Sequence, residues 1–295
     1  MTFNQQRATR MFKHISQGIV IALVAALPLS AQAHRAWMIP STTILSGDAP
    51  WVTVDAAVSN DLFYFEHHPL ILEGIGEAPE RAGRTPSRLL ITAPDGSNVP
   101  ARNGHVGKYR SVFDVQLQHK GTYKLAVAGD SRYLARYRHN GEARRWMGAL
   151  SDVGGAVPAD ADDLQISQMD SRMEVFITSG KPTDSVFEPT GRGLELKPIS
   201  HPNDLFAEEP SEFVFLLDGQ PAADVEVTVI PGGVRHRDDL NDLQHTTGAD
   251  GKVVITWPSA GFWWLEARVQ QDGGLTPPLT QRRASYTATL EVMAP

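Results

Sequence analysis

Alternating apolar and polar residues in the first half of the chain predict a series of β-strands. A period of two is the pattern of a strand with one buried face. Gly121 separates two of these runs, 111–118 and 122–129, and the spacing predicts that they form a hairpin. The acidic, Gly- and Ala-rich stretch at 152–163 predicts a surface loop. The strand-like runs are 50–58, 89–94, 111–118, 122–129, 131–138 and 172–179.

The same alternation restarts after residue 190 and predicts a second group of strands. Asp218-Gly219 and Asp250-Gly251 are strong turn dipeptides between apolar runs. The runs at 252–258 and 261–270 follow each other closely and are expected to pair. Several short strands separated by frequent turns are typical of a small β-sandwich. The predicted strands are 193–199, two within 211–233, 252–258, 261–270 and 285–293.

These patterns predict an all-β chain made of two β-sandwich, immunoglobulin-like domains. No amphipathic stretch of helical length stands out anywhere in the sequence. The restart of the pattern places a domain boundary near the Ser179-Gly180-Lys181-Pro182 bend. We therefore expect an N-terminal domain over 34–185 and a C-terminal domain over 190–295.

The first 33 residues have the organisation of a secretory signal peptide. Basic residues precede an apolar run at 18–30, and Ala31-Gln32-Ala33 matches the small-x-small cleavage pattern. A membrane anchor needs about 20 apolar residues, and this run is shorter and contains Pro28. We expect cleavage after Ala33, export to the periplasm, and a soluble mature protein without a transmembrane segment.

Charge and cysteine content narrow the possible functions. The chain has a formal charge of -7, and removal of the three basic residues of the signal peptide deepens it to -10. The chain therefore lacks the excess of basic residues that nucleic-acid binding requires. The sequence has no cysteine, which excludes disulfides and thiolate metal ligands and leaves nitrogen and oxygen donors.

Motifs that would indicate an enzyme are absent from the sequence. There is no G-x-S-x-G elbow, no H-E-x-x-H, no P-loop and no G-x-G-x-x-G, and we expect no enzymatic activity. Trp263 and Trp264 could suggest a sugar-stacking platform together with Trp257. Adjacent residues of a strand face opposite sides, however, so core packing is the favoured interpretation.

His34 is the most informative of the ten histidines. Cleavage after Ala33 would make it the first residue, and its free α-amine and imidazole Nδ1 could then close a chelate ring on a metal ion. Both groups can lose their protons near neutral pH. Nitrogen donors suit nickel, cobalt, copper and zinc. Mature position three is Ala36, so the tighter amino-terminal motif with a histidine at that position is absent.

Three further histidines are weaker candidates for metal ligands. His67 and His68 would face opposite sides of a regular strand, but Pro69 suggests that the strand is ending, where both could turn toward one ion. An exposed pair at a strand end is an equally good interpretation. His201 begins the sequence His-Pro-Asn-Asp, for which a structural turn is favoured over a ligand role.

Several stretches together resemble a family of bacterial periplasmic proteins that carry a domain of unknown function linked to nickel and cobalt uptake. The resemblance implies a pair of β-sandwiches and an accessory component of an envelope metal transporter. It also implies His34 as the best candidate for a metal ligand, with His67, His68 and His201 as weaker candidates. The stretches are 34–40, 60–69, 193–205, 218–221, 247–251, 261–264 and 284–290.

Three functions stay open at this point. The favoured one is a periplasmic protein that binds nickel, cobalt or a related transition metal through His34 and serves its uptake. A second is a copper chaperone or a copper oxygenase with a histidine brace, which needs His34 and one more histidine such as His68 or His201. A third is an envelope module that binds a protein or a sugar without a metal.

Overall fold

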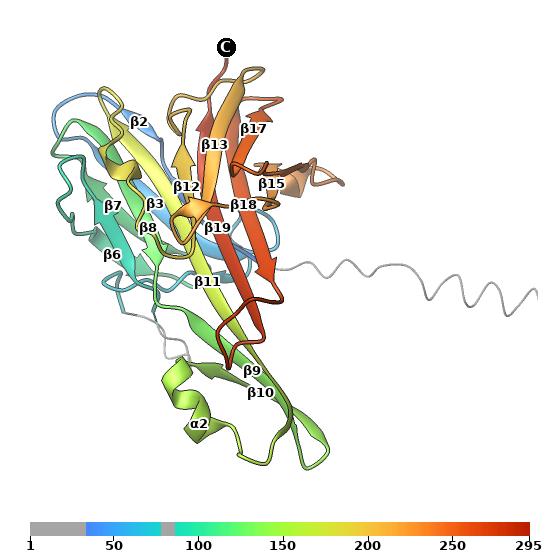
Figure 1. Cartoon of the computed structure of the whole chain (residues 1–295). Coiled ribbons are helices and arrows are strands. Elements are labelled where there is room, and N and C mark those ends of the chain that lie inside the picture. The colour runs from blue at the N-terminus through green and yellow to red at the C-terminus, as the bar shows by residue number, and fades with distance from the viewer. Residues whose placement is uncertain (1–33, 78–85) are drawn as a thin grey trace, which may run out of the picture. The chain divides into compact units, whose positions relative to one another are not determined.

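The computed structural model describes residues 34–77 and 86–295, so the predicted signal peptide at 1–33 lies outside the described residues. The described chain consists mainly of β-strands (Figure 1), which confirms the predicted fold class. Its one α-helix is the four-residue α2 (Val153–Ala156). No helix in these two ranges is long and apolar enough to cross a membrane.

The strands form three sheets. The five-stranded sheet contains β1 (Arg35–Pro40), β3 (Trp51–Ser59), β4 (His68–Pro69), β6 (Arg102–Val106) and β7 (Ser111–Gln116). The four-stranded sheet contains β12 (Leu194–Pro198), β13 (Pro210–Leu217), β14 (Gln220–Pro221) and β17 (Lys252–Thr256). The ten-stranded sheet contains β2 (Ile44–Leu45), β5 (Leu89–Thr92), β8 (Gly121–Ala128), β9 (Arg132–His139), β10 (Glu142–Gly148), β11 (Asp162–Ser179), β15 (Glu226–Pro231), β16 (Leu243–Thr246), β18 (Gly261–Gln271) and β19 (Gln281–Val292).

The first sandwich packs the five-stranded sheet against β5, β8 and one end of β11. Alternate residues of the facing strands point inward and build one apolar core. Val54 and Phe113 come from one sheet, and Leu125 and Val175 from the other, and all four are fully buried. Burial of such side chains contributes about 1.5–3 kcal/mol each, so this core stabilises the arrangement that places β1 and β4.

The second sandwich packs the four-stranded sheet against β15, β18 and β19. Its core includes Phe213, Phe215, Trp263 and Tyr286. Trp264 points to the other side of β18 and packs in a separate cluster with Trp37 of β1, as strand alternation predicted. Trp257, Trp263 and Trp264 are all at most 2% exposed, so these three tryptophans form core packing and no exposed platform for a sugar.

The two sandwiches share one continuous sheet. The 18-residue strand β11 pairs with β9 near its start, runs parallel to β19 from Ser167 to Val175, and pairs with β8 at its end. Residues 34–295 form one compact unit. Each sandwich has its own core cluster, and Phe176 of β11 belongs to the core of the second sandwich. The domain boundary expected near residues 179–182 stays a prediction.

Two predicted strand pairs do not form. Strand β7 belongs to the five-stranded sheet and β8 to the ten-stranded sheet, so the chain crosses the sandwich at Gly121 instead of making a hairpin. The same correction applies to β17 and β18, which lie in different sheets. Alternation reports that a strand has one buried face, but it does not say which strand is its neighbour.

The predicted loop at 152–163 is also partly corrected. It contains the short helix α2, and its last two residues already belong to β11. Val153 and Val157 are buried with Ala135 and Ile166 in a small cluster of their own. This cluster supports the part of the β9–β10 hairpin that extends beyond the two sandwiches (Figure 1).

Candidate functional site

Strand pairing brings His34 and His68 to one end of the first sandwich. In the register of β1 and β3, Arg35 lies opposite Ser59, so His34 lies opposite Asn60. On the other side of β3, Val58 pairs with His68 of β4. Paired residues of neighbouring strands share one face of a sheet. His34, Asn60 and His68 therefore share a face at the end of β3.

The rings of three predicted histidines are in contact at this end. The imidazoles of His34 and His67 are stacked, with centroids 3.8 Å apart and planes 23° apart. The ring of His67 also lies against that of His68, with a centroid distance of 4.7 Å. His34 and His67 are exposed, and His68 is half-buried. We call these three residues the histidine cluster.

Two polar residues that the sequence did not single out hold the histidine cluster. The Asn60 side chain and Nδ1 of His34 are joined by a hydrogen bond of 2.8 Å through Asn60 Oδ1. The backbone N–H of Asn60 donates to Glu66 Oε1 at 2.5 Å, which fastens the start of the loop to its end. The carbonyl of Pro69 accepts from Nδ1 of His68 at 2.9 Å. Asn60 and Glu66 both fall in the stretch 60–69 that carried the family resemblance.

Packing of partly buried aromatic residues against Trp37 fixes the loop that carries His67 and His68. Trp37 of β1 lies edge-on to Phe63, at a centroid distance of 5.5 Å, and also contacts Phe65. The indole N–H of Trp37 donates to Ser59 Oγ at 2.7 Å, and the indole N–H of Trp264 donates to the carbonyl of Ala36 at 3.2 Å. Trp37 belongs to the first sandwich and Trp264 to the second. Packing in both sandwiches therefore positions the backbone that carries the exposed imidazoles.

His201 lies away from the histidine cluster, in contact with a different set of residues. Its Nδ1 accepts a hydrogen bond from the backbone N–H of Asn203 at 3.0 Å, and its Nε2 lies 2.9 Å from Thr122 Oγ1. Asn203 in turn donates to the carbonyl of Phe176 on β11. With both ring nitrogens engaged, His201 fastens a turn onto the sheet and does not join the other three histidines.

Burial lowers the pKa of His201 below its usual value. A group whose pKa is lower in the folded state stabilises the fold above its unfolded pKa, and this stability is lost as the pH falls through the folded pKa. Replacing His201→Asn keeps an acceptor for the Asn203 N–H but removes the titrating group. We expect the wild type to lose more unfolding free energy than the variant between about pH 8 and about pH 5.5. Urea unfolding at both pH values measures this, and equal losses would contradict it.

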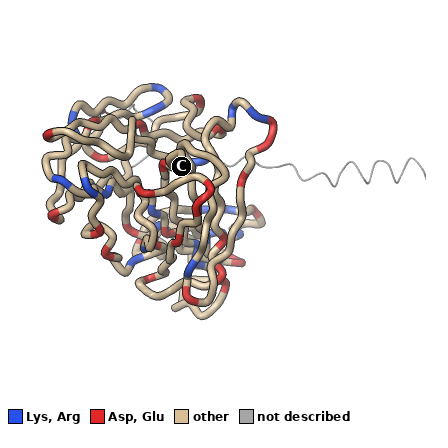
Figure 2. Tube along the Cα trace, turned by 90° about the horizontal axis from the view of Figure 1, so that it is seen from above, with Lys and Arg blue, Asp and Glu red and all other residues tan. Residues whose placement is uncertain are grey.

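The rest of the described chain offers no competing cluster of metal ligands. No three His, Cys, Asp or Glu side chains in residues 34–77 and 86–295 already converge as ligands of one metal ion. His119 and His139 lie in exposed contacts with Asp95 and Asp160, at 3.6 and 3.4 Å. Figure 2 shows acidic and basic positions scattered along the trace. Metal binding at the histidine cluster therefore requires its exposed rings to turn.

Comparison with solved structures finds distant likenesses. The D0-D1 domain of intimin aligns with 86% of this chain and 97% of its own length, at 11% identity and a TM-score of 0.22. The D00-D0 domain of intimin covers 88% of this chain and 100% of its own, at 10% identity and a TM-score of 0.20. Dimeric latent PorU from Porphyromonas gingivalis covers 91% of this chain and 21% of its own, at 12% identity and a TM-score of 0.20. Scores this low carry no argument about function.

Sequence comparison assigns the family. No curated protein matches the chain. The model of the family described as Domain of unknown function (DUF4198) matches residues 31–271. This range contains the expected cleavage point, the histidine cluster and most of both sandwiches. The chain therefore belongs to the DUF4198 family of domains of unknown function.

Proposed function

We propose that this protein is an exported metal-binding accessory protein that serves the uptake of nickel, cobalt or a related transition metal. The observation that carries the proposal is the contact of three imidazoles, those of His34, His67 and His68, at the first residue of the expected mature chain. Family membership is compatible with this role, and the sequence resemblance suggests the metal.

The amino terminus supplies the first two donors. After cleavage, the α-amine and Nδ1 of His34 can bind one ion in a single chelate ring. Both must be deprotonated to do so, which makes the affinity depend on pH. Nδ1 is engaged with Asn60 Oδ1, so the ion would take the place of this hydrogen bond. Asn60 would then hold the imidazole in place only while the metal is absent.

His67 and His68 supply the further donors. The stacked geometry places the ring of His67 beside that of His34 without pointing their nitrogens at one position. Because His67 is exposed, rotation of its side chain meets little packing resistance. A set made only of nitrogen donors suits nickel, cobalt, copper and zinc, and copper(II) is expected to bind more tightly than nickel(II).

Such a site is suited to carrying an ion rather than to chemistry. It lies at the surface, and the half-buried and exposed rings leave it open to exchange. The negative charge of the mature chain favours cations in its surroundings. We infer that the protein passes its ion to a transporter of the cell envelope, and we assign no reaction to the site.

Calorimetric titration with nickel(II) tests this role of the cluster. The protein should begin at His34, with the terminus verified by mass spectrometry. We expect the double variant His67→Ala, His68→Ala to bind nickel at least about 10- to 100-fold more weakly, because even outer contacts of metal sites contribute that much. The control is His105→Ala, His236→Ala, which removes two other exposed histidines.

The outcomes separate clearly. Weaker binding in the first double variant but not in the second supports the histidine cluster as the site. Equal affinity of the two double variants would exclude His67 and His68 as ligands. If the protein starting at His34 bound neither nickel, cobalt, copper nor zinc, the proposed function would be wrong, and a metal-independent envelope module would take its place.

A further inference from the structure

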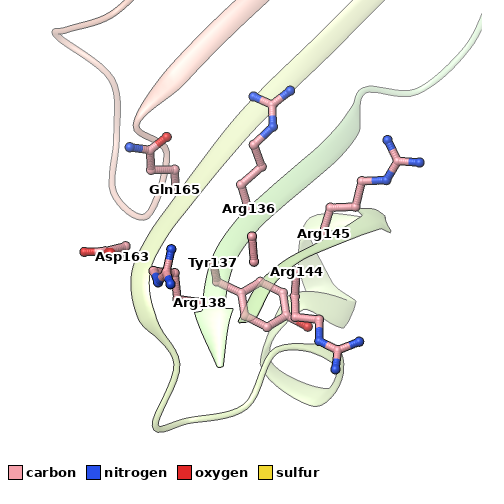
Figure 3. A pocket seen from close by; sticks show the side chains of 8 residues that line it. Arg136, Tyr137, Arg138, Arg144, Arg145, Asp163 and Gln165 are labelled. Atoms are coloured by element: carbon pink, nitrogen blue, oxygen red, sulfur yellow. The ribbon is translucent and has the colours of Figure 1, made fainter. Parts of the chain in front are cut away.

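Three arginines stand on one face of the ribbon formed by β10, β9 and β11. Arg145 of β10 lies directly opposite Arg136 of β9, and Gln165 of β11 follows on the other side of Arg136. Arg138 is two residues further along β9 and so shares this face. The residues line an open hollow of about 500 Å³ (Figure 3). We call Arg136, Arg138 and Arg145 the arginine face.

Two of the three arginines of this face, Arg136 and Arg145, lack an acidic partner among the described residues, whereas Arg138 lies opposite Asp162. Like charges directly opposite each other on neighbouring strands are destabilising, yet Arg136 and Arg145 occupy such a pair. Within residues 34–77 and 86–295, the guanidinium groups of Arg136 and Arg145 form no ion pair. Their neighbour Arg144, on the same strand as Arg145, does form one, with Glu142. Asp163 also lines the hollow but points away from Arg136 and Arg145 in Figure 3.

The opposite face of the ribbon explains why the arginines point outward. Ala135, Tyr137 and Trp146 alternate with the arginines and pack on the cluster around Val153 and Ile166. The packed face leaves the arginine face turned to solvent, on a hairpin that extends beyond both sandwiches (Figure 1). Exposed guanidinium groups in a row, all donors, fit a surface that presents many acceptor oxygens.

An exposed apolar side chain accompanies the arginines on this face. Met147 shares the face, because it lies two residues beyond Arg145, and is 44% exposed. Basic residues together with exposed apolar side chains are the combination found at membrane interfaces. The arginine face is therefore suited to phosphate groups that stand beside hydrocarbon.

We propose that the arginine face docks the protein onto an anionic phospholipid surface. The arginines bind headgroup phosphates, while Met147 enters the boundary of the acyl chains. The rest of the mature chain is negatively charged and is repelled by such a surface. Contact through the hairpin therefore gives the protein one orientation on the membrane.

Sedimentation with lipid vesicles tests the proposal. We expect the protein beginning at His34 to bind vesicles of phosphatidylglycerol and phosphatidylcholine mixed in equal parts, and not vesicles of phosphatidylcholine alone. Each basic residue near an anionic surface contributes about 1 kcal/mol, so the double variant Arg136→Gln, Arg145→Gln should bind about 30-fold more weakly. Added salt should weaken binding of the wild type.

A matched control removes two positive charges elsewhere. Lys181→Gln, Lys197→Gln changes two exposed residues far along the chain from the hairpin and should leave vesicle binding nearly unchanged. Equal losses in the two double variants, or no binding to the anionic vesicles, would overturn the proposal. Displacement by soluble glycerol phosphate at low concentration would also overturn it, because it would indicate a site for a small free anion.

Discussion

Replacing Arg172→Met should lower the free energy of unfolding by about 3–5 kcal/mol, the cost of leaving buried charges without their partner. Arg172 lies 3.1 Å from Glu174 Oε1 and 3.3 Å from Glu195 Oε1, and the three side chains are 11%, 4% and 6% exposed. Methionine preserves the apolar stem but removes the only cation that contacts these carboxylates among the described residues.

The loss of unfolding free energy should be large because further hydrogen bonds hold each carboxylate in its buried position. Neither carboxylate can therefore move into water when the arginine is removed. Tyr286 Oη donates to Glu174 Oε2 at 2.9 Å, and burial raises the pKa of Tyr286 well above its usual value. Glu195 accepts hydrogen bonds from the backbone N–H groups of Thr190 and Gly191. The cluster joins β11, β12 and β19, and therefore spans the two sandwiches.

Chemical unfolding of the wild type and of two variants measures this effect. The control is Arg144→Met, since Arg144 and its partner Glu142 are 58% and 67% exposed. Exposed pairs contribute about 0–1 kcal/mol, so the control should lose no more than that. If both variants lost similar amounts, the cluster around Arg172 would not hold the two halves together.

The positions of the strands were predictable from the sequence, whereas the pairing of each strand with its neighbours in a sheet was not. Period-two alternation and turns such as Asp218-Gly219 located most strands of both sandwiches, because burial of one face is a local property of a strand. The pairing of β11 with β19 joins residues more than a hundred positions apart. No local pattern encodes such a contact, and for the same reason the two predicted pairs at Gly121 and before Gly261 were wrong.

The candidate site was likewise predictable only in part, since the sequence indicated the candidate ligands but not their contacts. His34 stood out because of the expected cleavage point, and Pro69 suggested how His67 and His68 could turn toward one place. Their contact depends on the flanking of β3 by β1 and β4, which only the fold supplies. Asn60 carried no chemical signal of its own. His201 was also a candidate ligand, but residues that are distant in sequence or follow it in the turn form hydrogen bonds with both of its ring nitrogens. The fold therefore separates it from the other three histidines.

Acetylation of the α-amine of His34 should weaken nickel binding on the order of 100-fold, the upper end of what single contacts of metal sites contribute. Acetylation converts the α-amine of His34 into an amide, which is a poor donor, and introduces no other amine beside the imidazole. The three imidazoles and the fold stay the same. The change therefore isolates the amine from every other part of the proposed site.

The most direct measurement is a calorimetric nickel titration of two proteins, one with a free α-amine at His34 and one acetylated at that amine, each verified by mass spectrometry. We predict tight binding of one ion by the first and a large loss of affinity in the second, with equal melting temperatures of the metal-free proteins. Equal affinities would contradict the account, because the mature amino terminus would then take no part in holding the metal.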